Sequence, residues 1–325
     1  MATYVLDGKS AATLARCPLA VRLAVSGVPN ADGVRLVARS RGGQPAAGVV
    51  ETSPSMLILP RVTEEIVVAA VPAHADLFAS GTTVHVSIGP DGAADHETDI
   101  AQLTPRDVSG LGFIELASVS PGAGETIQVA TRLTLPDSPL PPVAAAARVA
   151  TRGVLKVDRV HESQARPVRL FVDTSASMAW LFASGMVAAA GDIVAGLGAV
   201  ISGGPDVTVG MAGPAAAPPG PLAGEHVGAA LAQAPAAGYG LSGGVRVAPA
   251  PGTLTVVVTD AVPAALSDDQ VALVLTESVS ARAGLRGAVL SPVPDPQQVL
   301  VAQPEYVNRV VAELLAPLGL AGGAR

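Results

Sequence analysis

The sequence predicts two domains in 325 residues: an all-β sandwich, then an α/β domain with a doubly wound parallel sheet. Short segments rich in Val, Ile, Thr and Leu fill the chain to about residue 135. From about residue 168, strand-like and helix-like runs alternate. A Pro-rich segment, Leu135 to Arg148, separates these two regions of different composition. We therefore expect a sandwich over residues 1–138, a Pro/Ala-rich linker with a connecting strand over residues 139–165, and the α/β domain over residues 166–325.

Seven segments of the first part have the composition of strands, and Gly, Pro, Asn and Asp separate them at even spacing. No long apolar run with a 3.6-residue period occurs there, so we expect no long helix within residues 20–130. The seven segments are LAVRLAVSGV, GVRLVARS, SMLILP, EEIVVAAVP, TTVHVSIG, GFIELASVS and TIQVATRLTL. Their order favours an antiparallel sandwich.

The second part alternates strands with helices. VRLFVD, DVTVGMAG, TLTVVVTDA and RGAVLSP are expected as strands, and MAWLFASGMVAAAGDIVAGLGAVI as one long helix. EHVGAALAQA and EYVNRVVAELLAPL are expected as helices, and SDDQVALVLTESVSA opens with Ser267 and Gln270 at the spacing of a capping box. The last helix carries its apolar face on Val307, Val310, Val311, Leu314 and Leu315.

This alternation implies a parallel sheet with helices on both faces, and ligands then bind at the carboxyl ends of the strands. Asp173 and Asp260 each follow an apolar strand and are expected at such ends.

The composition argues against several classes of function. The net charge of −7 argues against a nucleic-acid-binding protein, which would need a basic surface. Cys17 is the single cysteine, so no internal disulfide forms and a reducing compartment is indicated. No run reaches the roughly 18 apolar residues needed to span a membrane, and the N-terminus lacks the apolar region of a signal peptide. We expect a cytoplasmic protein. No G-x-S-x-G elbow, P-loop or G-x-G-x-x-G fingerprint occurs.

The stretch RLFVDTSASMAW holds Asp173, Ser175 and Ser177 at alternate positions of a strand-to-helix turn. One carboxylate and two hydroxyls are hard oxygen ligands, suited to Mg²⁺ or Mn²⁺ with waters completing an octahedron. A cation held by one aspartate stays electron-poor and attracts a carboxylate from outside. We expect the Asp173 side chain at a loop tip outside the core. The alternative is that Ser175 or Ser177 only caps the following helix.

The turn resembles the metal-ion-dependent adhesion site of von Willebrand factor type A domains, and VVVTDA is similar to that family's strand ending in Thr-Asp-Gly. The resemblance implies a doubly wound fold over residues 166–325 and a site in which Asp260 closes the first motif. Glu225 stands where the family has a threonine. It could bind the metal, occupy the partner's position, or mark a degenerate site. The implied metal ligands are Asp173, Ser175, Ser177, Glu225 and Asp260.

SMAWLFASG resembles the same turn in type A domains of bacterial tellurium-resistance proteins, which often follow a TerD-like β-sandwich. Residues 64–130 resemble the second half of a TerD domain in the order of their strands and loops. That family usually binds Ca²⁺ through paired acidic clusters, but only Asp32 remains near the first one. The crowded acidic residues of a later hairpin are expected to be solvated, without Ca²⁺; they are Asp91, Asp95, Glu97 and Asp99.

The favoured function is non-enzymatic: metal-dependent binding of a partner protein that presents an acidic residue, within a bacterial stress-response or tellurium-resistance-like system. One alternative is an enzyme that uses the metal as a Lewis acid for hydrolysis or phosphoryl transfer, with Glu225 or His226 as base. Another is a structural subunit of a larger assembly. Trp180 lies in a strongly apolar run and is expected in the core.

Overall fold

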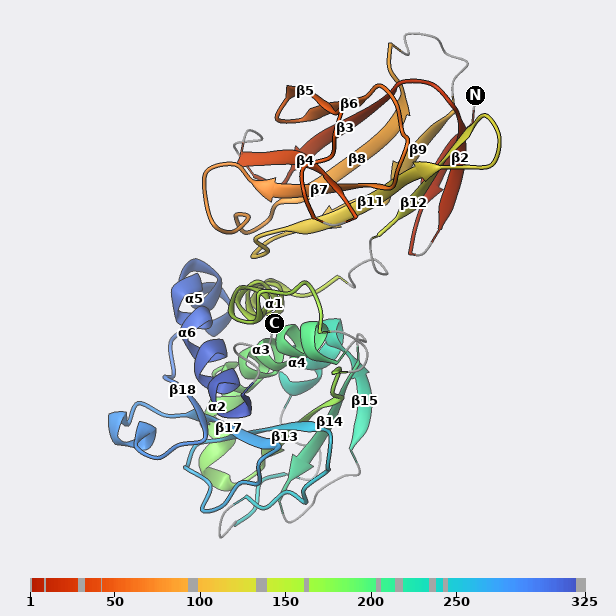
Figure 1. Cartoon of the computed structure of the whole chain (residues 1–325). Helices are drawn as coiled ribbons and strands as arrows, with labels where there is room; N and C mark the ends of the chain where they lie inside the picture. The colour runs from red at the N-terminus through yellow and green to blue at the C-terminus, as the bar shows by residue number, and fades with distance from the viewer. Residues whose placement is uncertain are drawn as a thin grey trace. The chain divides into compact units, whose positions relative to one another are not determined.

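The computed structural model divides the chain into two compact units, Met1–Asp137 and Ser138–Arg325 (Figure 1). The described residues are 2–8, 10–28, 33–41, 43–92, 99–132, 139–160, 164–202, 206–213, 219–233, 238–241 and 245–319.

The N-terminal unit consists of two β-sheets around one apolar core, and no α-helix occurs in its described residues. The first sheet runs β1 (Thr3–Leu6), β9 (Ile100–Leu103), β8 (Thr83–Pro90), β3 (Leu19–Ser26), β6 (Met56–Leu59) and β5 (Val50–Ser53), with β10 (Arg106–Asp107) also paired to β8. The second runs β2 (Ala11–Ala15), β12 (Thr126–Thr131), β11 (Ile114–Pro121), β7 (Ile66–Pro72) and β4 (Val34–Ser40).

The seven expected strands are confirmed as β3, β4, β6, β7, β8, β11 and β12. Their alternating buried side chains, such as Val21 and Leu23 of β3 and Val68 and Ala70 of β7, meet in the shared core. Five further short strands, β1, β2, β5, β9 and β10, were not predicted. One of them, β1, pairs parallel with β9, so the first sheet is not wholly antiparallel.

The C-terminal unit is built on a six-stranded sheet. Its order is β15 (Gly220–Ala223), β14 (Asp206–Ala212), β13 (Val168–Asp173), β16 (Leu254–Thr259), β17 (Gln270–Leu275) and β18 (Gly287–Leu290). All neighbours pair parallel except β15, which runs antiparallel at the edge. The strand order reverses around β13, which places this strand at the switch point where the carboxyl ends open a site.

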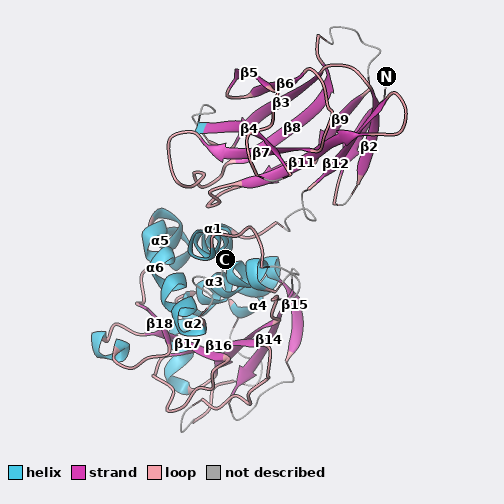
Figure 2. Cartoon of the chain, in the orientation of Figure 1, coloured by secondary structure: helices cyan, strands magenta, loops and turns pink. Residues whose placement is uncertain are grey.

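The helices are α1 (Pro142–Leu155), α2 (Ala179–Ala183), α3 (Met186–Ile201), α4 (Val227–Leu231), α5 (Pro296–Ala302) and α6 (Pro304–Leu315). The three with ten or more residues, α1, α3 and α6, share one apolar core with alternate residues of the strands, and Figure 2 shows them on one side of the sheet. The predicted apolar face of α6 is confirmed as buried.

The expectation of helices on both faces is wrong for the described residues. Alternate strand residues point to the other face of the sheet, and those on this face, such as Phe171 and Val257, are buried but lie outside the core that the helices share. A loop covers part of this face: Gly240 lies against the carboxyl end of β13, and the Val247 carbonyl accepts a hydrogen bond from the Gln270 side chain at the amino end of β17.

The expected linker over residues 139–165 is mostly the helix α1, and no strand forms there among the described residues. Pro142 occupies the first turn, where proline is tolerated, and the following alanines are strong helix formers. The buried face of α1, which includes Val143, Ala144 and Ala147, packs on α3 and α6. The proline-rich composition therefore marks a helix start.

Two further expectations need correction. The long helix after Asp173 is interrupted: a 3₁₀ turn (Ala176–Met178) and α2 come first, and Gly185 adopts a φ of 79° before α3 begins. The segment that opens with Ser267 forms the strand β17 instead of a helix. Its Ser267 N–H does donate to Oε1 of Gln270 at 3.1 Å, but this contact closes a turn that precedes a strand.

Within the described residues, no single helix has the length and apolar composition to cross a membrane. The pair Ala176–Ala183 and Met186–Ile201, bent by 80° at its break, meets that test of length and composition only when both pieces are taken together.

Candidate metal centre

Asp173 is the last residue of β13, and its side chain is buried, with 4 % of the residue exposed. Its Oδ1 accepts a hydrogen bond from the Ser175 N–H at 2.8 Å, and its Oδ2 accepts one from Oγ1 of Thr259 at 2.9 Å. The expectation of an exposed side chain at a loop tip is therefore wrong. Both carboxylate oxygens have donors, as a buried charge requires, and they fix the shape of the turn.

The hydroxyls of Ser175 and Ser177 lie together, with their Oγ atoms 3.0 Å apart. Adjacent ligands of an octahedral Mg²⁺, at bond lengths of about 2.1 Å and a right angle, lie about 3.0 Å apart. The pair thus already has the spacing of two neighbouring ligands. Ser175 is buried and Ser177 is exposed, so the pair opens to solvent on one side.

The capping alternative does not describe this turn. Ser175 occupies the N-cap position of the 3₁₀ turn, and Met178 that of α2, but neither side chain makes a capping hydrogen bond. The bond that Ser175 Oγ makes joins it to Ser177 Oγ.

A second segment contacts the turn from far along the chain. The Ala176 N–H donates to the Gly240 carbonyl at 2.9 Å, and the Gly240 N–H donates to the Thr174 carbonyl at 3.1 Å. Ser175 and Gly240 form an isolated parallel bridge. This contact could not be predicted from the motif, because nothing in the motif specifies which loop will lie beside it.

Asp260 follows the last residue of β16 at the same edge of the sheet and is partly exposed. The residue that contacts Asp173 is its neighbour Thr259. The sequence pattern pointed to the aspartate of VVVTDA, and the role of the threonine before it was not predicted. The signal available in the sequence was a threonine as the last residue of an apolar strand.

Glu225 does not lie near this turn. In the antiparallel pairing of β15 with β14, Ala223 is level with Asp206, whereas Asp173 is level with Ala212. Six strand residues at roughly 3.3 Å each separate these two levels, a distance of about 20 Å. Two residues beyond Ala223, Glu225 cannot return over that distance. The structure therefore places Glu225 at the opposite end of the sheet, where it pairs with His226 at 3.3 Å.

A different carboxylate is buried within the helical layer. Asp192 of α3 accepts a hydrogen bond from Nε2 of Gln297 in α5 at 2.8 Å, and its carboxylate faces the backbone of Gly228 in α4. Burial raises the pKa of Asp192, while the hydrogen bond from Gln297 and the nearby backbone of Gly228 lower it by less. Asp192 joins three helices and belongs to the packing of the unit.

The polar contacts of the N-terminal unit that are described are structural. Asp99 accepts hydrogen bonds from the Ala2 N–H at 2.8 Å and the Tyr4 hydroxyl at 3.3 Å, which ties β1 to β9. Asp91 is exposed. The remaining acidic residues proposed for this unit, Asp32, Asp95 and Glu97, lie outside the described residues.

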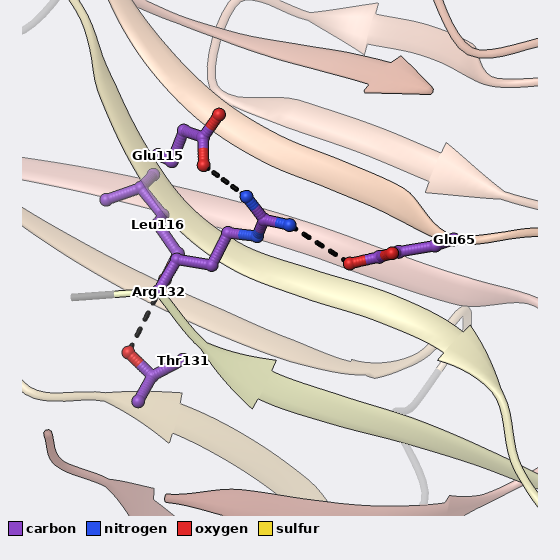
Figure 3. A network of polar contacts seen from close by, with 5 residues as sticks. All are labelled: Glu65, Glu115, Leu116, Thr131 and Arg132. Carbon is purple, nitrogen blue, oxygen red and sulfur yellow. Dashed lines mark hydrogen bonds and ion pairs between the residues drawn. The ribbon is translucent and has the colours of Figure 1, made fainter. Parts of the chain in front are cut away.

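Arg132, just after β12, forms ion pairs with Glu115 and, at 3.0 Å, with Glu65 (Figure 3). The Glu115 carboxylate raises the pKa of Arg132, and the Glu65 carboxylate does so to a smaller extent. The Arg132 N–H also donates to the Leu116 carbonyl at 2.9 Å, so the end of β12 is held to β11.

Comparisons of the chain with protein-family models, with curated proteins and with solved structures found no match. Across the part of the chain that the structure describes, no group of three or more His, Cys, Asp or Glu side chains could hold a metal. The candidate site at Asp173 is of another kind, because it combines one strand-end carboxylate with neutral hydroxyls.

Proposed function

We propose that the C-terminal unit binds Mg²⁺ or Mn²⁺ at the carboxyl end of β13 and thereby docks an acidic residue of a partner protein, without catalysing a reaction. The observation that carries this proposal is the Ser175–Ser177 hydroxyl pair, whose oxygens lie 3.0 Å apart beside the Asp173 carboxylate. Carboxylate and hydroxyl oxygens are the donors that these cations prefer.

Each side chain has a distinct part in this proposal. Ser175 and Ser177 would provide two direct ligands, and Asp173, which holds the turn through its bonds to Ser175 N and Thr259, would provide negative charge. Asp260, after the neighbouring strand, would hold the cation through water. When bound, the cation would supply positive charge together with water-filled positions that an outside carboxylate can take.

The wider setting rests on the sequence resemblances. A type A-like fold for the C-terminal unit agrees with its strand order and its antiparallel edge strand. A TerD-like identity for the N-terminal unit agrees with two sheets around one core, and we assign it a structural or partner-binding part without Ca²⁺. We accordingly assign the chain to a cytoplasmic, stress-response or tellurium-resistance-like system of bacteria.

The register of the sheet disfavours the enzymatic alternative that the sequence suggested. Its two candidate bases, Glu225 and His226, follow β15 at the opposite end of the sheet from Asp173. A general base must lie within hydrogen-bond reach of the proton that it removes, directly or through one water. Neither side chain meets this condition for a substrate bound at the Asp173 turn.

Calorimetric titration of the full chain with Mg²⁺ and Mn²⁺ tests the cation site. The wild type should bind both, and Ser177→Ala should weaken binding about tenfold or more, since loss of even an outer-shell partner costs that much. Ser280→Ala is the matched control. The Oγ atoms of Ser278 and Ser280, after β17, also lie 2.8 Å apart. The residue that corresponds to Asp173 there is Thr276, whose side chain is a hydroxyl and carries no carboxylate.

The control should bind as the wild type does. Absence of binding by the wild type, or equal losses in both variants, would overturn the cation site. Partner docking is tested by pull-down with the full chain in Mg²⁺ and in EDTA, read by mass spectrometry. A partner should be lost in EDTA and with Ser177→Ala, whereas capture that is indifferent to both would contradict metal-dependent docking.

A further inference from the structure

Three segments that meet at the carboxyl end of β13 each carry an exposed large apolar side chain. The described residues of the C-terminal unit include four exposed large apolar side chains: Trp180, Leu241, Val262 and Val301. The first three belong to segments that meet at the Asp173 turn. Trp180 is 54 % exposed and Leu241 is 92 % exposed, so the expectation that Trp180 lies in the core is wrong.

An aromatic contact holds the first two segments together. Phe182 of α2 and Tyr239 meet edge to face, with ring centroids 5.7 Å apart and an angle of 61° between the rings. Phe182 is buried, two residues after Trp180, and Tyr239 lies two residues before Leu241. Two residues turn an α-helix by about 200°, so Trp180 points away from the buried Phe182 and remains exposed.

Hydrogen bonds tie two of the segments that carry these side chains to the turn itself. Gly240, which precedes Leu241, bonds to the backbone on both sides of Ser175. Val262 follows a turn in which the Ala261 N–H donates to Oγ1 of Thr259 at 3.4 Å, and that oxygen donates to Asp173. We name Trp180, Leu241 and Val262 the apolar rim.

The segments that carry the apolar rim have no cationic side chain. Residues 174–182, 238–241 and 259–264 contain no Lys or Arg, and their one charged residue is Asp260. An acidic group beside the docked carboxylate would find no opposite charge there and would be repelled by Asp260. Apolar side chains at those positions would instead remove the rim from water.

We infer that the partner segment presents one carboxylate with apolar side chains on either side, which pack on Trp180, Leu241 and Val262. This inference rests on the proposed function, because the cation would supply the charge that complements the carboxylate. Exposed tryptophan beside a central polar contact is typical of the side chains that carry most of the binding energy in protein interfaces.

A display library of heptapeptides with a fixed central aspartate, selected on the full chain in Mg²⁺ and eluted with EDTA, tests the inference. Apolar residues should be enriched next to the aspartate. The combined variant Trp180→Ser, Leu241→Ser, Val262→Ser should lose that enrichment and bind the selected peptides about tenfold more weakly. Val301→Ser is the matched control, because Val301 and Val262 are both 45 % exposed.

The control should select the same peptides as the wild type. Two results would overturn the apolar rim as a docking surface and leave metal-dependent docking intact. One is that the EDTA-eluted peptides show no enrichment of apolar residues next to the aspartate, and the other is that the combined variant selects the same enrichment as the wild type. No EDTA-eluted peptide from the wild type would overturn both, and the titration with Mg²⁺ alone would then show whether the cation site also fails.

Discussion

Oγ1 of Thr259 donates a hydrogen bond of 2.9 Å to Oδ2 of Asp173 and joins the carboxyl ends of β16 and β13. Both residues are buried, so this bond supplies one of the two donors that the Asp173 carboxylate needs. The geometry of the candidate metal centre thus depends on a residue that is not expected to be a ligand.

Thr259→Val should lower the free energy of unfolding of the C-terminal unit by about 1–3 kcal/mol, because it leaves a buried carboxylate oxygen without a donor. Urea unfolding followed by fluorescence measures this, since Trp180 is the only tryptophan and lies in that unit. Thr255→Val is the control in the same strand. The buried Thr255 Oγ1 has no hydrogen-bond partner among the described residues, so its loss should be neutral or stabilising. Equal destabilisation by the two variants would contradict the role of the bond.

Gly196→Ala should destabilise the C-terminal unit by about 1–3 kcal/mol, because a Cβ there would overlap the Ala144 carbonyl and lie 2.8 Å from Cβ of Ala147, both in α1. Gly198→Ala, two residues along in α3, would meet Cγ2 of Val207 at 3.1 Å, a tight contact without backbone overlap. Both changes gain about 1 kcal/mol of helix propensity. The difference in their urea midpoints therefore isolates the packing of α1 on α3. Similar midpoints would mean that α1 is not packed as described.

The stability of the C-terminal unit should depend on the protonation of Asp192. Burial raises the pKa of Asp192 in the folded state above its ordinary value of 3.8, so the folded chain binds a proton more readily than the unfolded chain. The stability that Asp192 contributes is then fully present below the ordinary pKa and is lost as pH rises through the raised one.

Asp192→Asn removes this titration, and a rotated Gln297 amide can still bond the new side chain. The free energy of unfolding of the variant minus that of the wild type should therefore rise with pH above about 4 and then level off. Urea unfolding at a series of pH values measures the difference. A difference that stays constant, or falls as pH rises, would show that burial does not control this carboxyl group.

Glu225→Thr should leave the affinity for Mg²⁺ and Mn²⁺ unchanged, because β15 carries Glu225 to the opposite end of the sheet. Titration calorimetry of this variant beside Ser177→Ala provides the comparison. Weaker cation binding by Glu225→Thr would show that the chain around β15 adopts another arrangement when the cation is present.

Local pattern was sufficient for much of this fold. Strand composition and turn residues located seven strands of the N-terminal unit, and helical spacing located the buried face of α6. The same reasoning failed at Ser267 and Gln270, whose hydrogen bond exists but closes a turn before β17. It also failed at Pro142, where proline begins a helix. A local signal such as the Ser267–Gln270 hydrogen bond or a proline can precede either a helix or a strand. Burial of the following residues in the sheet or in the helical core decides which of the two forms.

The sequence by itself determined that Asp173 and Asp260 stand at the carboxyl ends of apolar strands and that Ser175 and Ser177 follow Asp173 at alternate positions, because these features depend on local order alone. Only the tertiary structure decided which distant groups meet there. Thr259 and Gly240 reach the turn, and Trp180 and Leu241 remain exposed beside it. Glu225 is carried away because β15 pairs antiparallel with β14. The short connection between β14 and β15 permits only an antiparallel pair, but the Gly-Pro composition of β15 is atypical of a strand, so only the tertiary structure showed that this segment pairs with β14.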